Sequence, residues 1–334
     1  MSIPMTRRTV LGAAAATALP CLAACSDETR QMIATDAQPA GYPTVQALQF
    51  FSDTLAERSG GRIRFHVYAG AQLGSENDTI ELAQFGGVDI IRVNSTPMNV
   101  IVAETLVPAL PFLFRDIDHM RRAMDGAPGQ AILDALAPKG LIGLCFYDSG
   151  ARSFYTASRL IHQPKDLAGL KIRVQSSDLL VSMVEALGGD ATPMSYGEVY
   201  QGMMQGVIDG AENNWPSYES SRHYEVAPFY SETRHVMAPE ILAMSRRAWE
   251  RLTAPDQELV LTCARESVPF MRDIWDARVR TAEAAVLAAG VTVTDDIDHT
   301  AFARRVEPVW AKYLKSPALK RLAEDVQAVG ATDA

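Results

Sequence analysis

The chain has 334 residues, of which 48% are hydrophobic and 21% charged, an ordinary composition for a globular protein long enough to form two domains. Its formal net charge of -9 argues against nucleic acid as a partner, because phosphate backbones attract basic surfaces. Any site for an anion must therefore be built from local positive charge.

The first thirty residues have the features of an export signal. A twin-arginine pattern, Thr-Arg-Arg-Thr-Val at residues 6–10, precedes an alanine-rich apolar segment at 11–19 that is too short to anchor the chain across a bilayer. Residues 22–25, Leu-Ala-Ala-Cys, resemble a lipoprotein signal box. We expect residues 1–24 to be removed and Cys25 to carry lipid; the alternative is an ordinary cleavage site nearby, with Cys25 incidental.

From residue 42 the hydrophobic pattern alternates between helix and strand. In the first part of the chain it predicts helices at 45–55, 79–85, 119–124 and 130–136, and strands at 63–68, 88–93 and 141–146. Such alternation implies a mainly parallel sheet with helices on both faces, in which ligands bind at the carboxyl ends of the strands.

Turn residues at 148–152 mark a crossing into a second domain. There the pattern predicts strands at 171–174, 190–192 and 207–211, and helices at 178–187 and 198–205. A strand at 239–243 should return to the first domain, followed by a short helix at 246–252. Domain I is thus predicted to contain residues 25–150 and 238–278, and domain II residues 151–237 and 279–334.

A long helix should begin at Thr253, which supplies a capping hydroxyl, and run without a glycine until Gly290. At about 36 residues it would measure about 54 Å, more than the width of one domain. Pro269 should kink or divide this helix, because proline removes a backbone donor and crowds the preceding turn. The tail, 299–329, also has a helical pattern, with a break at residues 316–317.

Two cysteines remain beyond the signal, Cys145 in an apolar run and Cys263 in a helical pattern. They could pair in an oxidising compartment, but neither has the spacing of a disulfide framework or a metal knuckle, so we expect buried free thiols. The six histidines have no metal-ligand spacing or nucleophile motif, and no phosphate or dinucleotide loop is present. We therefore expect no cofactor, no metal and no enzymatic activity.

A set of short motifs, found in a fixed order, resembles the solute-binding proteins of TRAP transporters (the DctP-type family) over nearly the whole mature chain. The motifs lie at residues 61–68, 72–74, 86–89, 111–114, 166–174, 189–194, 198–202 and 206–213. The resemblance implies a two-lobed α/β periplasmic binding protein whose long helix spans both lobes. It also implies a small carboxylate-bearing solute as ligand and transporter membrane subunits as partners, with membrane contact through the possible lipid anchor.

Arg173, near the end of the short apolar run 170–174, is the most informative residue. A guanidinium offers a rigid fork of donors that matches a carboxylate in two parallel hydrogen bonds. Taken alone, such an arginine more often covers apolar surface or pairs with a nearby acid. The resemblance implies instead that Arg173 grips the ligand carboxylate from the second domain.

The resemblance gives three further residues of the second domain a role. Arg152 corresponds to a second arginine near the same carboxylate, although its place in a predicted turn also fits a solvated side chain. Asn213 corresponds to an asparagine that contacts the ligand. Tyr196 corresponds to an aromatic residue that excludes water from the clamp, or else it packs at a helix start.

On the opposing domain, Asn94 and Ser95 follow the strand that ends at residue 93, and Glu76 and Asn77 follow the turn at 72–74. Each could face the crevice, or could lie in a solvated loop. Arg92, in the middle of the strand, is either structural or a source of extra positive charge.

Residues 212–215, Glu-Asn-Asn-Trp, favour a hydroxyl-rich ligand. Glu212 and the two asparagines offer donors and acceptors, and the indole of Trp215 could cover the apolar face of a sugar. Similar runs occur in uronate-binding relatives, whereas a dicarboxylate would require a second strong cation. We predict a sugar acid such as a hexuronate or aldonate; the alternatives are a C4-dicarboxylate or other carboxylate, or a sensor role at a membrane receptor.

Overall fold

Two mixed β-sheets, one in each lobe, organise the chain, and the structure, a computed structural model, describes residues 30–330. The sheet of the first lobe has the order β2 (Ile63–Tyr68), β1 (Arg30–Asp36), β3 (Ile90–Asn94), β10 (Glu240–Ser245), β4 (Leu141–Tyr147). Strand β1 runs parallel to β2 and β3, and β10 runs antiparallel to β3 and β4. Strand β10, where a strand was predicted at 239–243, thus lies in the sheet of the first lobe.

The sheet of the second lobe has the order β11 (Thr292–Thr294), β9 (Phe229–Val236), β5 (Arg152–Thr156), β8 (Gly210–Asn213), β6 (Lys171–Val174), β7 (Asp190–Pro193). The β8, β6 and β7 unit is parallel, as the alternating pattern indicated, and β5 runs antiparallel to both of its neighbours. The chain passes from one sheet to the other between β4 and β5 and again between β9 and β10.

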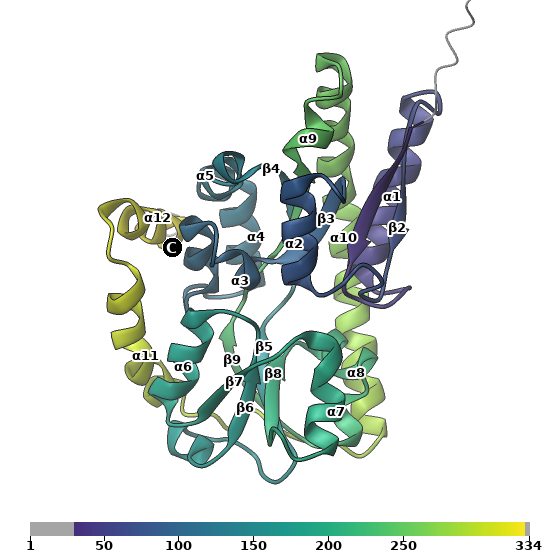
Figure 1. The fold of residues 1–334 in the computed structure, drawn as a ribbon. Helices are drawn as coiled ribbons and strands as arrows, with labels where there is room; N and C mark the ends of the chain where they lie inside the picture. Colours follow the sequence, from purple (N-terminus) through teal and green to yellow (C-terminus); the bar gives the residue numbers. More distant parts are fainter. Residues whose placement is uncertain (1–29, 331–334) are drawn as a thin grey trace, which may run out of the picture.

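Helices cover the sheet of the first lobe (Figure 1). They are α1 (Pro43–Arg58), α2 (Glu76–Phe85), α3 (Ser95–Met98), η1 (Ala103–Ala109), α4 (Ile117–Asp125), α5 (Ala127–Asp134), η2 (Ala137–Lys139) and α9 (Arg246–Trp249). Helix α2 begins with a capping box between Ser75 and Asp78 and ends at Gly86, whose φ of 80° closes the last turn. This cap fixes Glu76 as the first helical residue beside the cleft.

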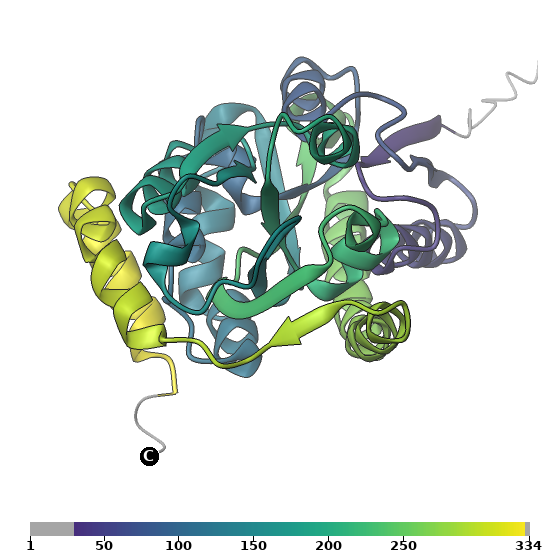
Figure 2. The ribbon, with the colours of Figure 1, turned by 90° about the horizontal axis from the view of Figure 1, so that it is seen from below.

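The second lobe is built from η3 (Pro164–Leu167), α6 (Asp178–Leu187), η4 (Tyr196–Glu198), α7 (Val199–Met204), α8 (Trp215–Ser220), η5 (His223–Glu225) and α11 (His299–Tyr313). Helix α6 packs against α11, and its buried leucines share one hydrophobic core with Phe302 and Val306 of α11. Seen from below, α11 and the end of the long helix lie on opposite sides of this lobe (Figure 2).

The long helix α10 (Ala254–Ala288) has 35 residues and is capped by the Thr253 hydroxyl, as predicted. It contacts α1 and β4 in the first lobe and α8 in the second, so it spans both lobes (Figure 1). Pro269 lies inside this single helix, and the expectation that the proline could divide it is wrong. Burial of residues such as Met271 and Trp275 along its length compensates for the lost backbone hydrogen bond.

The last helix, α12 (Pro317–Ala328), departs from the predicted division of the chain. It begins at the predicted break, with Ser316 as its cap, and then lies beside η1 and α5 of the first lobe. There Nε2 of His119 lies 2.8 Å from the carbonyl of Val326. The C-terminal segment assigned to domain II therefore returns to the first lobe, and the other boundaries stay predictions.

Cys145 and Cys263 are buried free thiols, in agreement with the sequence. Within residues 30–330, no helix has both the length and the apolar character that crossing a bilayer requires. The predicted signal peptide, residues 1–24, and the lipidation site, Cys25, lie outside the described residues.

Candidate functional site

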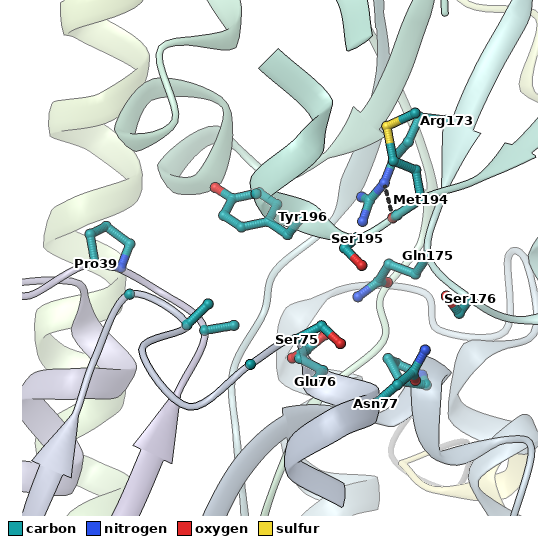
Figure 3. A pocket seen from close by; sticks show the side chains of 16 residues that line it. Pro39, Ser75, Glu76, Asn77, Arg173, Gln175, Ser176, Met194, Ser195 and Tyr196 are labelled. Carbon is teal, nitrogen blue, oxygen red and sulfur yellow. Dashed lines mark hydrogen bonds between the residues drawn. The ribbon is translucent and has the colours of Figure 1, made fainter. Parts of the chain in front are cut away.

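Two adjoining cavities occupy the cleft between the lobes, an outer one of about 360 Å³ and an inner one of about 20 Å³. Residues from both lobes line both of them: Ala37, Glu76, Arg173, Gln175 and Tyr196. The first lobe contributes the end of β1 and the start of α2, and the second contributes β6 and η4 (Figure 3). The cleft thus lies at the carboxyl ends of parallel strands, as expected for this class of sheet.

Arg173 is buried and faces the cavity. Its Nε donates a hydrogen bond to the carbonyl of Met194 at 2.9 Å, and its terminal nitrogens point into the cleft beside Tyr196 and Gln175 (Figure 3). Within residues 30–330, no carboxylate forms a salt bridge with it. Burial, the largest influence, lowers the pKa of Arg173, although Glu212 opposes the shift. The site therefore contains a desolvated cation whose terminal N–H groups are available to a ligand.

Arg152 is buried as well, but its charge is already neutralised. Its Nε donates to Glu212 Oε2 at 2.5 Å, a terminal nitrogen donates to Oε1 at 2.7 Å, and the other donates to Asn213 Oδ1 at 3.0 Å. The expectation that Arg152 lies in a turn is wrong, because it begins β5 and is 2% exposed. It borders only the inner cavity.

Glu212 lies behind Arg152 and lines neither cavity. Burial opposes its ionisation, yet Arg152 and His235 outweigh burial and hold its pKa at about 2. In this structure Glu212 holds Arg152 in position and does not itself line the cleft.

Asn213 and Tyr196 line the inner cavity together with Arg173. Asn213 ends β8 and borders the inner cavity, where its Oδ1 also accepts the backbone N–H of Asn214. The Tyr196 hydroxyl donates to the carbonyl of Ser217 at 3.0 Å, which fixes the ring against both cavities. A ring held in this way excludes water from beside a guanidinium.

The first lobe supplies the opposite wall. Glu76 Oε1 accepts the backbone N–H of Asn94 at 2.9 Å and a hydrogen bond from Arg92 at 3.2 Å. Asn94 is buried and borders the inner cavity, and Ser95 is buried without lining either cavity, so neither lies in a solvated loop. Asn77 is exposed and lines the outer cavity.

Arg92 belongs to the structure of the first lobe. It forms ion pairs with Asp36, with Glu76 at 3.2 Å and with Glu240 at 2.6 Å. Three carboxylates more than neutralise one guanidinium, so Arg92 adds no spare positive charge to the cleft. Of the two interpretations that the sequence left open, the structural one is confirmed.

Trp215 does not lie in this cleft, which corrects the sequence-based interpretation. Its ring stacks on Tyr230, with centroids 3.7 Å apart, and lines a separate hollow of about 620 Å³ together with Trp275. The cause is local: Asn214 caps α8, and Trp215 becomes the first helical residue with its indole turned toward β9. Tyr196 is the aromatic residue at the cleft.

The sequence-based search missed Gln175. It lines both cavities, and its Oε1 accepts a hydrogen bond from the Thr96 hydroxyl of the other lobe at 2.6 Å. Side chains two positions apart on a strand face the same side, so the place of Gln175 relative to Arg173 was the available signal. Asn99 and Ser177 form a similar hydrogen bond between the lobes at 3.0 Å.

Across residues 30–330, no group of three or more histidine, cysteine or acidic side chains is arranged to hold a metal ion. The arrangement does suit capture of an anion. One wall offers an uncompensated buried cation, and the other offers a carboxylate and an amide. Such a cleft can bind a solute that carries one carboxylate and several polar groups.

Comparison with known proteins agrees with this geometry. Residues 33–316 match the family described as bacterial extracellular solute-binding protein, family 7. A TRAP periplasmic solute-binding protein from Bradyrhizobium sp. BTAi1, in complex with α/β-D-galacturonate, is 48% identical with a TM-score of 0.88, covering 89% of this chain and 99% of that one.

Two further structures of TRAP periplasmic solute-binding proteins are similar over the same shares, 89% of this chain and 99% of theirs. The protein from Xanthobacter autotrophicus Py2, with bound β-D-galacturonate, is 47% identical with a TM-score of 0.88. The protein from Chromohalobacter salexigens, with bound D-glucuronate, is 41% identical with a TM-score of 0.87. The chain therefore belongs to family 7 of the bacterial extracellular solute-binding proteins, which serve TRAP transporters.

Proposed function

We propose that the protein captures a hexuronate, D-galacturonate or D-glucuronate, in the cleft and delivers it to the membrane subunits of a TRAP transporter. The family consists of extracytoplasmic solute-binding transport proteins and not of enzymes. Delivery would follow closure of the lobes about the two strand crossings and α10.

The buried guanidinium of Arg173 carries this proposal. It is 3% exposed, it has no ion-pair partner among the described residues, and it faces a cavity of about 360 Å³, which suits a monosaccharide. A ligand carboxylate would supply the missing charge in two parallel hydrogen bonds. We assign this contact to Arg173, with Arg152 and Asn213 completing the carboxylate end and Tyr196 covering it.

The opposite wall favours a sugar acid over a C4-dicarboxylate. A dicarboxylate needs a second uncompensated cation, but Arg92 on that wall is already held by three carboxylates. Ser75, Glu76 and Asn77 line the outer cavity there and can both accept and donate hydrogen bonds to hydroxyl groups. The uronates bound in the three similar structures have this combination of one carboxylate and several hydroxyls.

Export and anchoring complete the proposal. We infer that residues 1–24 direct the chain out of the cytoplasm and that Cys25 carries the lipid that holds it at a membrane. The sequence Leu-Ala-Ala-Cys at 22–25 supports this inference. Mass spectrometry of the exported protein tests it: a diacylated Cys25 at the N-terminus supports the anchor, and an unmodified N-terminus at another residue contradicts it.

A ligand panel tests the binding function. The mature chain would be mixed with D-galacturonate, D-glucuronate, D-gluconate, succinate or neutral D-galactose, and thermal unfolding would be followed by fluorescence. Because a ligand stabilises the state that binds it, the uronates should raise the unfolding temperature and galactose should not. Stabilisation by succinate without stabilisation by either uronate would contradict the proposal.

A further inference from the structure

The two carboxylate oxygens of Glu76 differ in their hydrogen bonds to the described residues. Its Oε1 accepts hydrogen bonds from the Asn94 backbone at 2.9 Å and from Arg92 at 3.2 Å. Among the described residues nothing donates to Oε2, and Glu76 lines both cavities opposite Arg173. The Glu76 side chain is 15% exposed and lies at the cavity wall, across the cleft from Arg173 (Figure 3).

The charges around Glu76 do not balance within its own lobe. Arg92 is shared by Asp36, Glu240 and Glu76, and the contact to Glu76 is longer than that to Glu240, 3.2 Å against 2.6 Å. Asp36 also accepts a backbone N–H at 2.7 Å and a threonine hydroxyl at 2.6 Å, and Glu240 also accepts the Asn94 amide at 3.1 Å. Glu76 accepts one Asn94 donor as Glu240 does, but of the three carboxylates it has the longest contact to the shared guanidinium and only one of its oxygens accepts a hydrogen bond from the described residues.

The second lobe balances this excess of negative charge only while the cleft holds no anion. Arg152 is neutralised by Glu212, whereas Arg173 faces Glu76 across the cavity and has no ion-pair partner among residues 30–330. A solute carboxylate bound to Arg173 neutralises the positive charge of its guanidinium, and the sugar displaces the water that solvates Glu76. Both changes disfavour the ionised form of a carboxyl group.

We propose, on the basis of the proposed uronate binding, that Glu76 binds the sugar as a neutral carboxylic acid, taking a proton from solvent onto Oε2 when the cleft fills. The new O–H donates a hydrogen bond to a hydroxyl or ring oxygen of the sugar, while Oε1 keeps its two donors. Glu76 is then a donor to the ligand and not only an acceptor. It also makes solute capture dependent on pH.

The surroundings of Glu76 agree with this assignment. Burial, the largest influence, raises the pKa of Glu76; Arg92 opposes the rise, and Glu240 and Asp36 add to it. Binding that consumes a proton is favoured at low pH and weakens as pH rises through the pKa of Glu76 in the complex. Affinity should fall by up to about tenfold per pH unit in that range.

Titration calorimetry with D-galacturonate and D-glucuronate tests the proposal directly. In two buffers with different protonation enthalpies, at several values between about pH 5 and pH 8, the wild-type heat of binding should depend on the buffer and correspond to uptake approaching about one proton per ligand. Glu76→Gln keeps an acceptor for Asn94 and Arg92 and presents a permanent N–H donor. It should bind with a heat that no longer depends on the buffer.

Glu81→Gln is the matched control, because Glu81 is exposed on the same helix. It should take up protons like the wild type, and circular dichroism of both variants verifies that they fold. Uronate binding without proton uptake in the wild type, or unchanged uptake in Glu76→Gln, would overturn this inference and leave the proposed function intact. If neither uronate bound the wild type, both would be overturned.

Discussion

Methionine in place of Arg173 would keep most of the buried aliphatic stem and remove the guanidinium. In the proposed complex, two parallel hydrogen bonds to a carboxylate are lost, each worth about 1.5 to 3 kcal/mol when a charged group takes part. A total of about 3 to 6 kcal/mol corresponds to uronate binding weakened by about 150- to 25,000-fold. Arg173→Lys should recover only part of this loss, because an ammonium cannot form the parallel pair.

The same substitution should change stability little. Within the described residues Arg173 makes no ion pair, and burial lowers its pKa, so the folded protein loses one hydrogen bond to Met194 and is relieved of one desolvated charge. We expect the free energy of unfolding to change by no more than about 1 kcal/mol. Arg152→Met is the matched control: it is equally buried, but it leaves Glu212 without its partner, and should cost about 3 to 5 kcal/mol.

Calorimetry gives the affinities and chemical denaturation gives the free energies of unfolding. The expected pattern is that Arg173→Met weakens uronate binding by at least about 150-fold in a stable protein, whereas Arg152→Met destabilises the fold. An Arg173→Met protein whose dissociation constant for uronate lies within about tenfold of the wild-type value would refute the reasoning. So would one that is as unstable as Arg152→Met, because Arg173 would then be a structural residue.

Three further predictions concern the cleft and its support. Thr96→Val removes the 2.6 Å hydrogen bond to Gln175 across the cleft and should weaken uronate binding about fivefold, as measured by calorimetry. Thr96→Ser, which keeps the hydroxyl, should bind with nearly the wild-type affinity. Trp215→Phe, which keeps a ring on Tyr230, should leave affinity within about twofold, and a large loss would restore the sugar-stacking interpretation. The low pKa of Glu212, about 2, stabilises the fold above about pH 4.5, and roughly 3 kcal/mol should be lost as pH falls from there toward 2. Denaturation at several pH values tests this, and a loss equally large in Glu212→Gln would contradict it.

Periodicity located the regular elements well where one face of an element is buried. The bounds of β2 and α6 agree with the sequence prediction, because β2 alternates at its start between buried and exposed residues and α6 ends at Gly188 with a φ of 95°. Strand β5 was missed, since all five of its residues are buried and no alternation marks it. A strand in the middle of a sheet covered on both faces gives no period-two signal.

Pairing of charges could not be predicted from the sequence in the same way. Arg152 and Arg173 both lie in short second-lobe strands, and the sequence gives no sign that Arg152 meets Glu212, sixty positions away, when β5 pairs with β8. The direction of Trp215 was equally hidden, since it depends on the cap at Asn214. The sequence motifs therefore identified the segments that form the cleft. Which side chains pair with one another could be seen only once the order of the strands was known.

The contrast among Arg92, Arg152 and Arg173 explains how the cleft can couple closure to the identity of the solute. Arg92 and Arg152 are neutralised by carboxylates of their own lobes, so neither gains when the lobes approach. Closure removes water from Arg173, which is unfavourable unless an anion enters with it. A neutral sugar that made every hydroxyl contact would still leave this guanidinium desolvated. Discrimination against neutral sugars then arises from the free energy of closing the lobes. Arg173→Met, which lacks the buried positive charge, should therefore close on neutral sugars more readily than the wild type.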